Sequence, residues 1–239
     1  SSLLEHVIFL DKLMSFEFVR DRTVTPTDDE LGEVHCRVLQ KMIDRGVFSM
    51  ESGHGASFSG PENDALRKRH GVQPAQTSSK STVSQLKNDL VGLSPDGERM
   101  FGFLCSTVWP FVDGYFAAAM CLTALVPNTK METKTLVERS QWLSETLFRD
   151  KRIEHYECCA SNTLSNAIAN FQSLGVLSKA KDGKVHTMHL SPQFQNQENL
   201  QVFVDKISFF RKFSPEQMSE TSKVADFPML AKHFARSSI

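Results

Sequence analysis

The densest run of hydrophobic positions in the chain is Phe101 to Val126, where Asp113 is the single charged residue among 26. The preceding dipeptide Ser94-Pro95 is typical of a helix start, since serine caps a helix and proline fits its first position. Pro110 lies inside the run and, lacking an N–H group, removes a helical hydrogen bond and kinks or splits the helix. We therefore predict a kinked helical hairpin on which the flanking segments pack.

The same run is long enough to cross the roughly 30 Å of hydrocarbon in a bilayer. However, a carboxylate such as that of Asp113 costs on the order of 2.5–3.5 kcal/mol at the bilayer centre. We predict burial inside the protein, and a membrane span is the alternative. A buried Asp113 then requires a partner, such as Tyr115 or a backbone N–H group, because buried carboxylates are paired.

Apolar residues at helical spacing predict further helices on both sides of this run. Thr27 and Glu30 have the spacing of a capping box, and Gly46 suits the position after the end of the helix that they begin. The helices predicted outside the apolar run span residues 3–15, 28–45, 84–93, 135–152, 161–174 and 199–212. Strands are predicted at 16–19 and 47–48, and a hairpin joins 176–177 to 185–190 through Asp182-Gly183.

These elements predict a mainly α fold with short β-hairpins (α+β). Between residues 49 and 82 the composition shifts to Ser, Gly, Pro, Gln and His, which is typical of a flexible linker. We predict a helical unit with a short strand at 1–52, a linker at 53–82, a helical C-terminal domain with a hairpin at 83–213, and a tail at 214–239. Segments 27–48 and 161–177 both run cap, helix, glycine, strand, so the kinked apolar helices are flanked by two winged-helix-like units.

The charge balance argues against a nucleic-acid partner. The formal net charge of −1 gives no field that would collect nucleic acid. The helix that follows Thr27 carries more acidic than basic residues, unlike a recognition helix. The five cysteines are odd in number and show no CxxC spacing, which indicates reduced thiols rather than disulfides or a metal site: Cys36, Cys105, Cys121, Cys158 and Cys159.

Candidate chemistry is sparse. His6 and Asp11 have the H-x4-D spacing of glycerolipid acyltransferases, but on a helix five residues turn the two side chains about 140° apart. His186 and His189 would face opposite sides of a strand, which makes them a weak metal pair, and His155 is interpreted as a surface histidine. We therefore predict no catalytic residue, no cofactor-binding residue and no metal site.

Two blocks of the sequence together resemble a known family. Residues 103–119, FLCSTVWPFVDGYFAAA, resemble a segment near the end of glycerol-3-phosphate acyltransferases of the mitochondrial and bacterial type. The helix at 164–177, with its Phe-x-x-Leu-Gly-Val-Leu close, and the later Leu190-Ser191 resemble the C-terminal block of that family. Residues 3–50, which end in MIDRGVFSM, resemble its preceding helices.

The resemblance implies a membrane-associated enzyme that transfers an acyl group from acyl-CoA to the sn-1 hydroxyl of glycerol 3-phosphate. In the family the catalytic H-x4-D and the phosphate-binding motifs lie far upstream, and none has a matching position here. The chain would be an accessory or regulatory C-terminal region without activity of its own. Its partners would be the upstream acyltransferase domain and a membrane surface, with acyl-CoA and glycerol 3-phosphate as substrates of the parent enzyme.

The implied location is the cytosol-facing surface of the mitochondrial outer membrane. The sister branch of the family, which acylates dihydroxyacetone phosphate in peroxisomes, is the first alternative. A winged-helix scaffold for interaction or nucleic-acid binding is the second. A freestanding enzyme that uses His6 and Asp11 is the third, and the helix geometry disfavours it.

Overall fold

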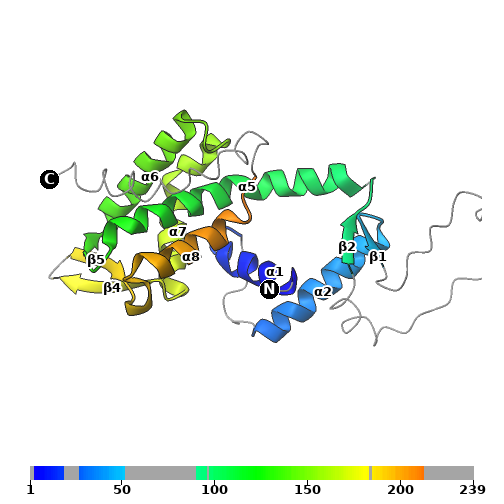
Figure 1. Ribbon diagram of the computed structural model, residues 1–239, viewed down its shortest axis with the longest axis horizontal. Coiled ribbons are helices and arrows are strands. Elements are labelled where there is room, and N and C mark those ends of the chain that lie inside the picture. The colour runs from blue at the N-terminus through cyan, green and yellow to red at the C-terminus, as the bar shows by residue number, and fades with distance from the viewer. Residues whose placement is uncertain (1–2, 19–26, 52–89, 96, 183–184, 213–239) are drawn as a thin grey trace, which may run out of the picture. The chain divides into compact units, whose positions relative to one another are not determined.

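The computed structural model describes residues 3–18, 27–51, 90–95, 97–182 and 185–212. The predicted fold class is confirmed, because the described residues form helices with short antiparallel strand pairs (Figure 1). The chain divides into two compact units: unit 1 comprises Ser1–Ile8 and Thr23–Phe103, and unit 2 comprises Phe9–Arg22 and Leu104–Ile239. The predicted linker at 53–82 and tail at 214–239 lie outside the described residues.

Unit 1 contains helix α2 (Asp28–Asp44), which begins at the predicted capping box. The Thr27 hydroxyl accepts a hydrogen bond from the Glu30 N–H group at 3.3 Å, and the Glu30 carboxylate accepts one from the Thr27 N–H group at 2.8 Å. The hydrogen bonds that the Thr27 N–H group and hydroxyl donate to the Glu30 carboxylate lower its pKa. Gly46 follows the helix with a φ of 71°, as its predicted role requires. The chain then enters strand β1 (Phe48–Glu51), which pairs antiparallel with β2 (Leu90–Leu93).

Ser94 joins this strand pair to the start of helix α5 (Gly97–Cys121). Its hydroxyl accepts a hydrogen bond from the Gly97 N–H group at 2.9 Å and donates one to the Gly46 carbonyl, which confirms the predicted capping role. A Cβ atom at Gly97 would lie 2.1 Å from the Val47 carbonyl oxygen. The close packing of the two backbone segments therefore requires glycine at this position.

Three predicted elements are wrong. The apolar run is not a split hairpin, because α5 continues through Pro110 and is followed by the 3₁₀ turn η1 (Leu122–Leu125). Burial of every residue from 112 to 121 offsets the one hydrogen bond that the proline removes. Residues 14–17 form a turn rather than a strand, and the C-terminal part of the helix predicted at 84–93 is strand β2. Residues 84–89 lie outside the described part of the chain.

Unit 2 contains most of the helices. Helix α6 (Thr133–Arg149) and helix α7 (Ser161–Ser173) precede a hairpin of β4 (Leu177–Asp182) and β5 (Val185–Leu190). Strand β3 (Met131–Glu132) completes an antiparallel sheet of order β3-β5-β4. The predicted hairpin is confirmed, whereas the likeness of these units to winged helices is not. The remaining elements are helix α1 (Leu3–Leu13), which spans both units, the 3₁₀ turns η2 (Tyr156–Cys159) and η3 (Pro192–Phe194), and helix α8 (Gln197–Ser208).

The second half of α5 forms the centre of the unit 2 core. In Figure 1, helices α6, α7 and α8 lie around it. The Tyr115 ring meets Phe171 of α7 edge-on at 5.9 Å, and Phe171 meets Phe203 of α8 at 5.3 Å. The end of α1 is fastened to α7, because the Asn170 amide donates hydrogen bonds to the Lys12 carbonyl and the Ser15 hydroxyl, both at 3.0 Å.

Within the described residues, one helical segment is long and apolar enough to cross a membrane. It spans Gly97–Leu125, and 72% of its most apolar window is buried inside the protein. Core helices of soluble proteins have the same length and composition, so this segment is weak evidence for a membrane span.

Candidate functional site

Asp113 is the most deeply buried charged side chain of α5, at 2% exposure. Trp109, Asp113 and Phe116 recur at intervals of four and three residues, which places them on one face of the helix. The neighbouring Gly114 lets this helix approach η2 and α7 closely: a Cβ atom there would lie 2.9 Å from the Thr163 methyl carbon and 3.1 Å from the Cys158 carbonyl oxygen. This contact brings the segment around His155 next to Asp113.

Two side chains from distant parts of the sequence bind the Asp113 carboxylate. The Arg211 Nε–H group donates to Oδ1 at 2.8 Å, and His155 Nδ1 lies 3.0 Å from Oδ2. Because an ionised carboxylate only accepts hydrogen bonds, the His155 proton is on Nδ1. The predicted partners of Asp113, Tyr115 or a backbone N–H group, are therefore wrong, and so is the interpretation of His155 as a surface residue, since only 21% of its side chain is exposed.

Arg211 makes two further contacts that hold its guanidinium in place. The Arg211 Nη2 atom donates a hydrogen bond to the Arg152 carbonyl at 2.7 Å, and the Arg211 Cζ atom lies 4.1 Å from the centre of the Phe116 ring. The Arg211 side chain is 5% exposed. We call Trp109, Asp113, His155 and Arg211 the Asp113 cluster.

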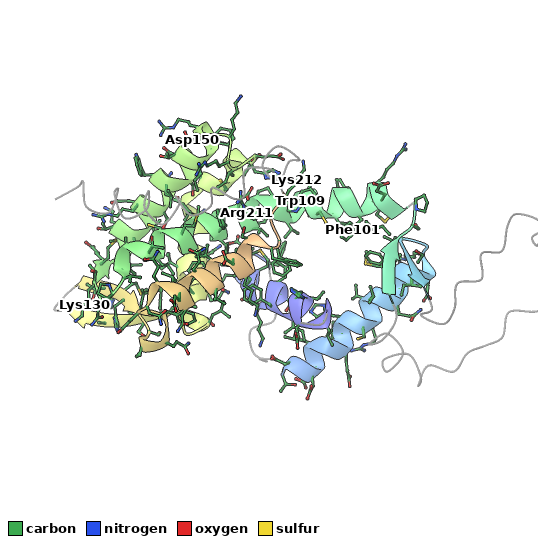
Figure 2. All side chains as sticks on the ribbon, viewed as in Figure 1. Phe101, Trp109, Lys130, Asp150, Arg211 and Lys212 are labelled. Carbon is green, nitrogen blue, oxygen red and sulfur yellow. The ribbon has the colours of Figure 1, made fainter. Side chains whose placement is uncertain are left out.

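Lys212 lies against Trp109 of the cluster, and both are labelled in Figure 2. The Lys212 ammonium lies 5.5 Å from the centre of the indole ring and 3.0 Å from a Glu154 carboxylate oxygen. Trp109 also stacks with the His155 imidazole, with 6.5 Å between the ring centres. The side chains of Arg211 and Asp113 are themselves only 5% and 3% exposed, and low exposure strengthens the electrostatic attraction between them.

The chemistry of the cluster is that of a structural ion pair. Both oxygens of Asp113 are occupied, and its charge is balanced by Arg211. An isolated charge at this depth costs several kcal/mol, whereas a paired and hydrogen-bonded one is tolerated. The geometry therefore fastens the segment after α8 to α5 and to the loop before η2.

No activated thiol adjoins this pair in the described part of the chain. Cys158 and Cys159 lie next to it, with their Sγ atoms 3.8 Å apart. Burial, followed by the neighbouring Cys159, raises the pKa of the Cys158 thiol, and burial raises that of Cys159. Burial also raises the pKa of Cys121 to about 11. Protonated thiols are poor nucleophiles and poor metal ligands.

A second buried polar contact lies on a different face of α5. Tyr115 is fully buried, and its phenol faces the Glu17 carboxylate from the turn after α1. Burial raises the pKa of Glu17, and burial together with the Glu17 charge raises that of Tyr115. Unlike Asp113, this carboxylate faces no cation in the contacts that the structure describes for it.

The other histidines singled out from the sequence are not brought together into a site. His6 and Asp11 lie five residues apart on α1, where helix geometry separates their directions by about 140°. His186 pairs across the hairpin with Lys181, and His189 pairs with Ser178, on opposite faces of β5. Among the described residues, no group of three or more His, Cys, Asp and Glu side chains is placed to hold a metal ion. That the chain carries no catalytic residue stays a prediction.

Sequence reasoning missed His155 and Arg211 as parts of the site. The need for a partner was readable, because Asp113 lies in an apolar run. A signal for Arg211 existed in Phe209-Phe210-Arg211-Lys212, where two aromatic residues precede two cations at the end of an amphipathic helix. The sequence pattern does not show which cation meets Asp113, because 98 positions separate the two residues.

Comparison with known families identifies the chain. A family model described as glycerol-3-phosphate acyltransferase C-terminal region matches residues 1–180. The chain belongs to this family. The comparison with curated proteins found no match. Within this glycerol-3-phosphate acyltransferase C-terminal region, Asp113 and His155 lie inside the matched range, whereas α8 and Arg211 lie beyond it.

Proposed function

We propose that the chain is an accessory, non-catalytic region of a membrane-associated enzyme that transfers an acyl group from acyl-CoA to the sn-1 hydroxyl of glycerol 3-phosphate. The family match over residues 1–180 carries this proposal. The chemistry of the described residues supports the non-catalytic role. The Asp113 carboxylate is paired with Arg211, and burial keeps the neighbouring Cys158 thiol protonated.

We further propose that the region docks on the acyltransferase domain of the parent enzyme and regulates it. Exposed apolar side chains on the unit 1 part of α5 support a docking role: Met100 is 56% exposed and Phe103 is 68% exposed. Three residues apart, they share one helix face. Large exposed apolar side chains grouped in this way are typical of interaction surfaces.

The location that we propose is the cytosol-facing surface of the mitochondrial outer membrane. Dihydroxyacetone phosphate is the alternative acyl acceptor, with a peroxisomal location. Acylation assays of the parent enzyme with each acceptor distinguish these two, since the better acceptor is used with the higher kcat/KM.

A two-part experiment tests the accessory role. The chain alone, supplied with acyl-CoA and glycerol 3-phosphate, is expected to give no turnover, and His6→Ala is expected to leave this result unchanged. Histidine-dependent turnover would overturn the proposal. The chain is also expected to bind a separately produced acyltransferase domain of the family. Phe103→Asp should abolish this binding, whereas Val202→Asp, at a 66% exposed position of α8, should leave it intact.

A further inference from the structure

The four residues that follow α8, Phe209–Lys212, contact three other segments of unit 2. Arg211 reaches Asp113 and Phe116 on α5 and the Arg152 carbonyl before η2. Lys212 binds Glu154 and covers Trp109. Arg211, Lys212 and Trp109 are labelled in Figure 2. This density of contacts is unusual for residues just beyond a helix end, where chains generally fray.

The same end of α8 also holds α1. The Phe9 ring stacks with Phe210 at 6.0 Å between ring centres, and the Lys206 ammonium lies 4.1 Å from the centre of the Phe9 ring. Phe210 is the direct neighbour of Arg211 and is partly buried against the core. The turn that carries both residues is closed by the hydrogen bond from the Arg211 N–H group to the Ser208 carbonyl at 3.1 Å.

We propose that Phe209–Lys212 form a releasable clasp, by which the end of α8 and the Phe9 turn of α1 open and close as one cooperative unit. In the closed state Arg211 is held by its hydrogen bonds to the Asp113 carboxylate and the Arg152 carbonyl, and its buried pairing with Asp113 is the contact that the test removes. A device of this kind transmits a change at the C-terminal helix to the N-terminal helix. It does not depend on the proposed enzymatic context, and its residues 209–212 lie beyond the range that the family model matches.

The end of α1 is held independently of the clasp and can be compared with the Phe9 turn of the same helix. Lys12 and Ser15 are bound to α7 by the Asn170 amide, and this attachment involves no residue of the clasp. Leu13 and Met14 are buried in the core, whereas Phe9 and Leu10 are only partly buried against it. Opening the clasp should therefore loosen the Phe9 turn and leave the end of α1 in place.

Amide hydrogen exchange on the whole chain tests the proposal, with Arg211→Met as the opening variant. We expect exchange at residues 209–211 and at residues 9–11 to accelerate together by on the order of tenfold or more, while α7 keeps its protection. Arg149→Met, which removes an exposed arginine paired with Glu145 at 4.0 Å, is the matched control and should change neither segment. Faster exchange at 209–211 with wild-type exchange at 9–11 would overturn the proposal.

A second readout uses the two tryptophans of the chain. In a Trp142→Phe background, Trp109 alone reports on the clasp, since Lys212 and His155 cover its ring. Arg211→Met should increase quenching of Trp109 by acrylamide at least about twofold, because local opening exposes the indole. If Arg211→Met fails to fold by circular dichroism, Phe210→Leu takes its place in the exchange measurement. Unchanged exchange at 9–11 in that variant overturns the proposal, and accelerated exchange supports it.

Discussion

Helix α5 buries Asp113 and Tyr115 only two residues apart, yet their surroundings differ in one decisive respect. Asp113 is met by a cation and an imidazole N–H group, so its charge is matched inside the protein. The phenol of Tyr115 is met by the Glu17 carboxylate, and burial works against the charged form of both groups. The buried charge on the face covered by α8 and the η2 loop is matched by a cation, whereas the partly buried Glu17 carboxylate on the face toward α1 is met by the hydrogen-bonding groups of Tyr115 and Asn166.

The largest expected effect comes from removing the cation. Arg211→Met leaves the buried carboxylate of Asp113 with His155 as its remaining partner in the described contacts. We expect the free energy of unfolding to fall by about 3–5 kcal/mol, because a buried charge loses its counter-ion. Chemical denaturation measures this change. The exposed Arg149→Met should stay within about 0.5 kcal/mol of wild type, and a similarly small loss in Arg211→Met would show that the cluster contributes little.

The next largest effect on stability should come from adding a methyl group at Gly114, where α5 packs closely against η2 and α7. Gly114→Ala would place its Cβ atom 2.9 Å from the Thr163 methyl carbon, and such overpacking costs about 1–3 kcal/mol. Gly102→Ala on the same helix meets no atom within 4 Å, and should raise stability by up to about 1 kcal/mol through helix propensity. Thermal denaturation of the pair checks the opposite signs, and equal effects would argue against a tight contact at Gly114.

The smallest effect concerns Glu17, on the face of α5 toward α1. Since burial raises the pKa of Glu17 above its ordinary value of 4.5, the folded chain holds this proton where the unfolded chain has lost it. The free energy of unfolding should therefore fall as pH rises from 4.5 through the raised pKa.

Glu17→Gln should flatten this part of the pH profile. At pH 7 it should gain on the order of 0.5 kcal/mol, a small figure because the carboxyl group is partly exposed. Denaturation at a series of pH values measures it. A steeper profile in Glu17→Gln would place the pH dependence elsewhere.

Local rules gave reliable predictions where the signal lay within one turn of the chain. The Thr27–Glu30 capping box, the glycines at 46 and 175 with positive φ, and the β4–β5 hairpin all follow from neighbouring residues. At Pro110 the local signal allowed either a kinked or a split helix, and the split into a hairpin is wrong because α5 continues through the proline. Burial along the next three turns outweighed the lost hydrogen bond. That burial depends on the other helices of the core and cannot be read from the segment around Pro110.

The sequence by itself determined the family, the mainly helical fold and the requirement that Asp113 have a partner, because an apolar run with one carboxylate states that requirement locally. Only the tertiary structure decided which residues meet it. His155 lies 42 positions and Arg211 98 positions away, and their approach depends on the packing of α5 against η2 and α8. Pairing over such separations is set by the shape of the core rather than by any periodic pattern in the chain, so the cluster could not have been read from the sequence.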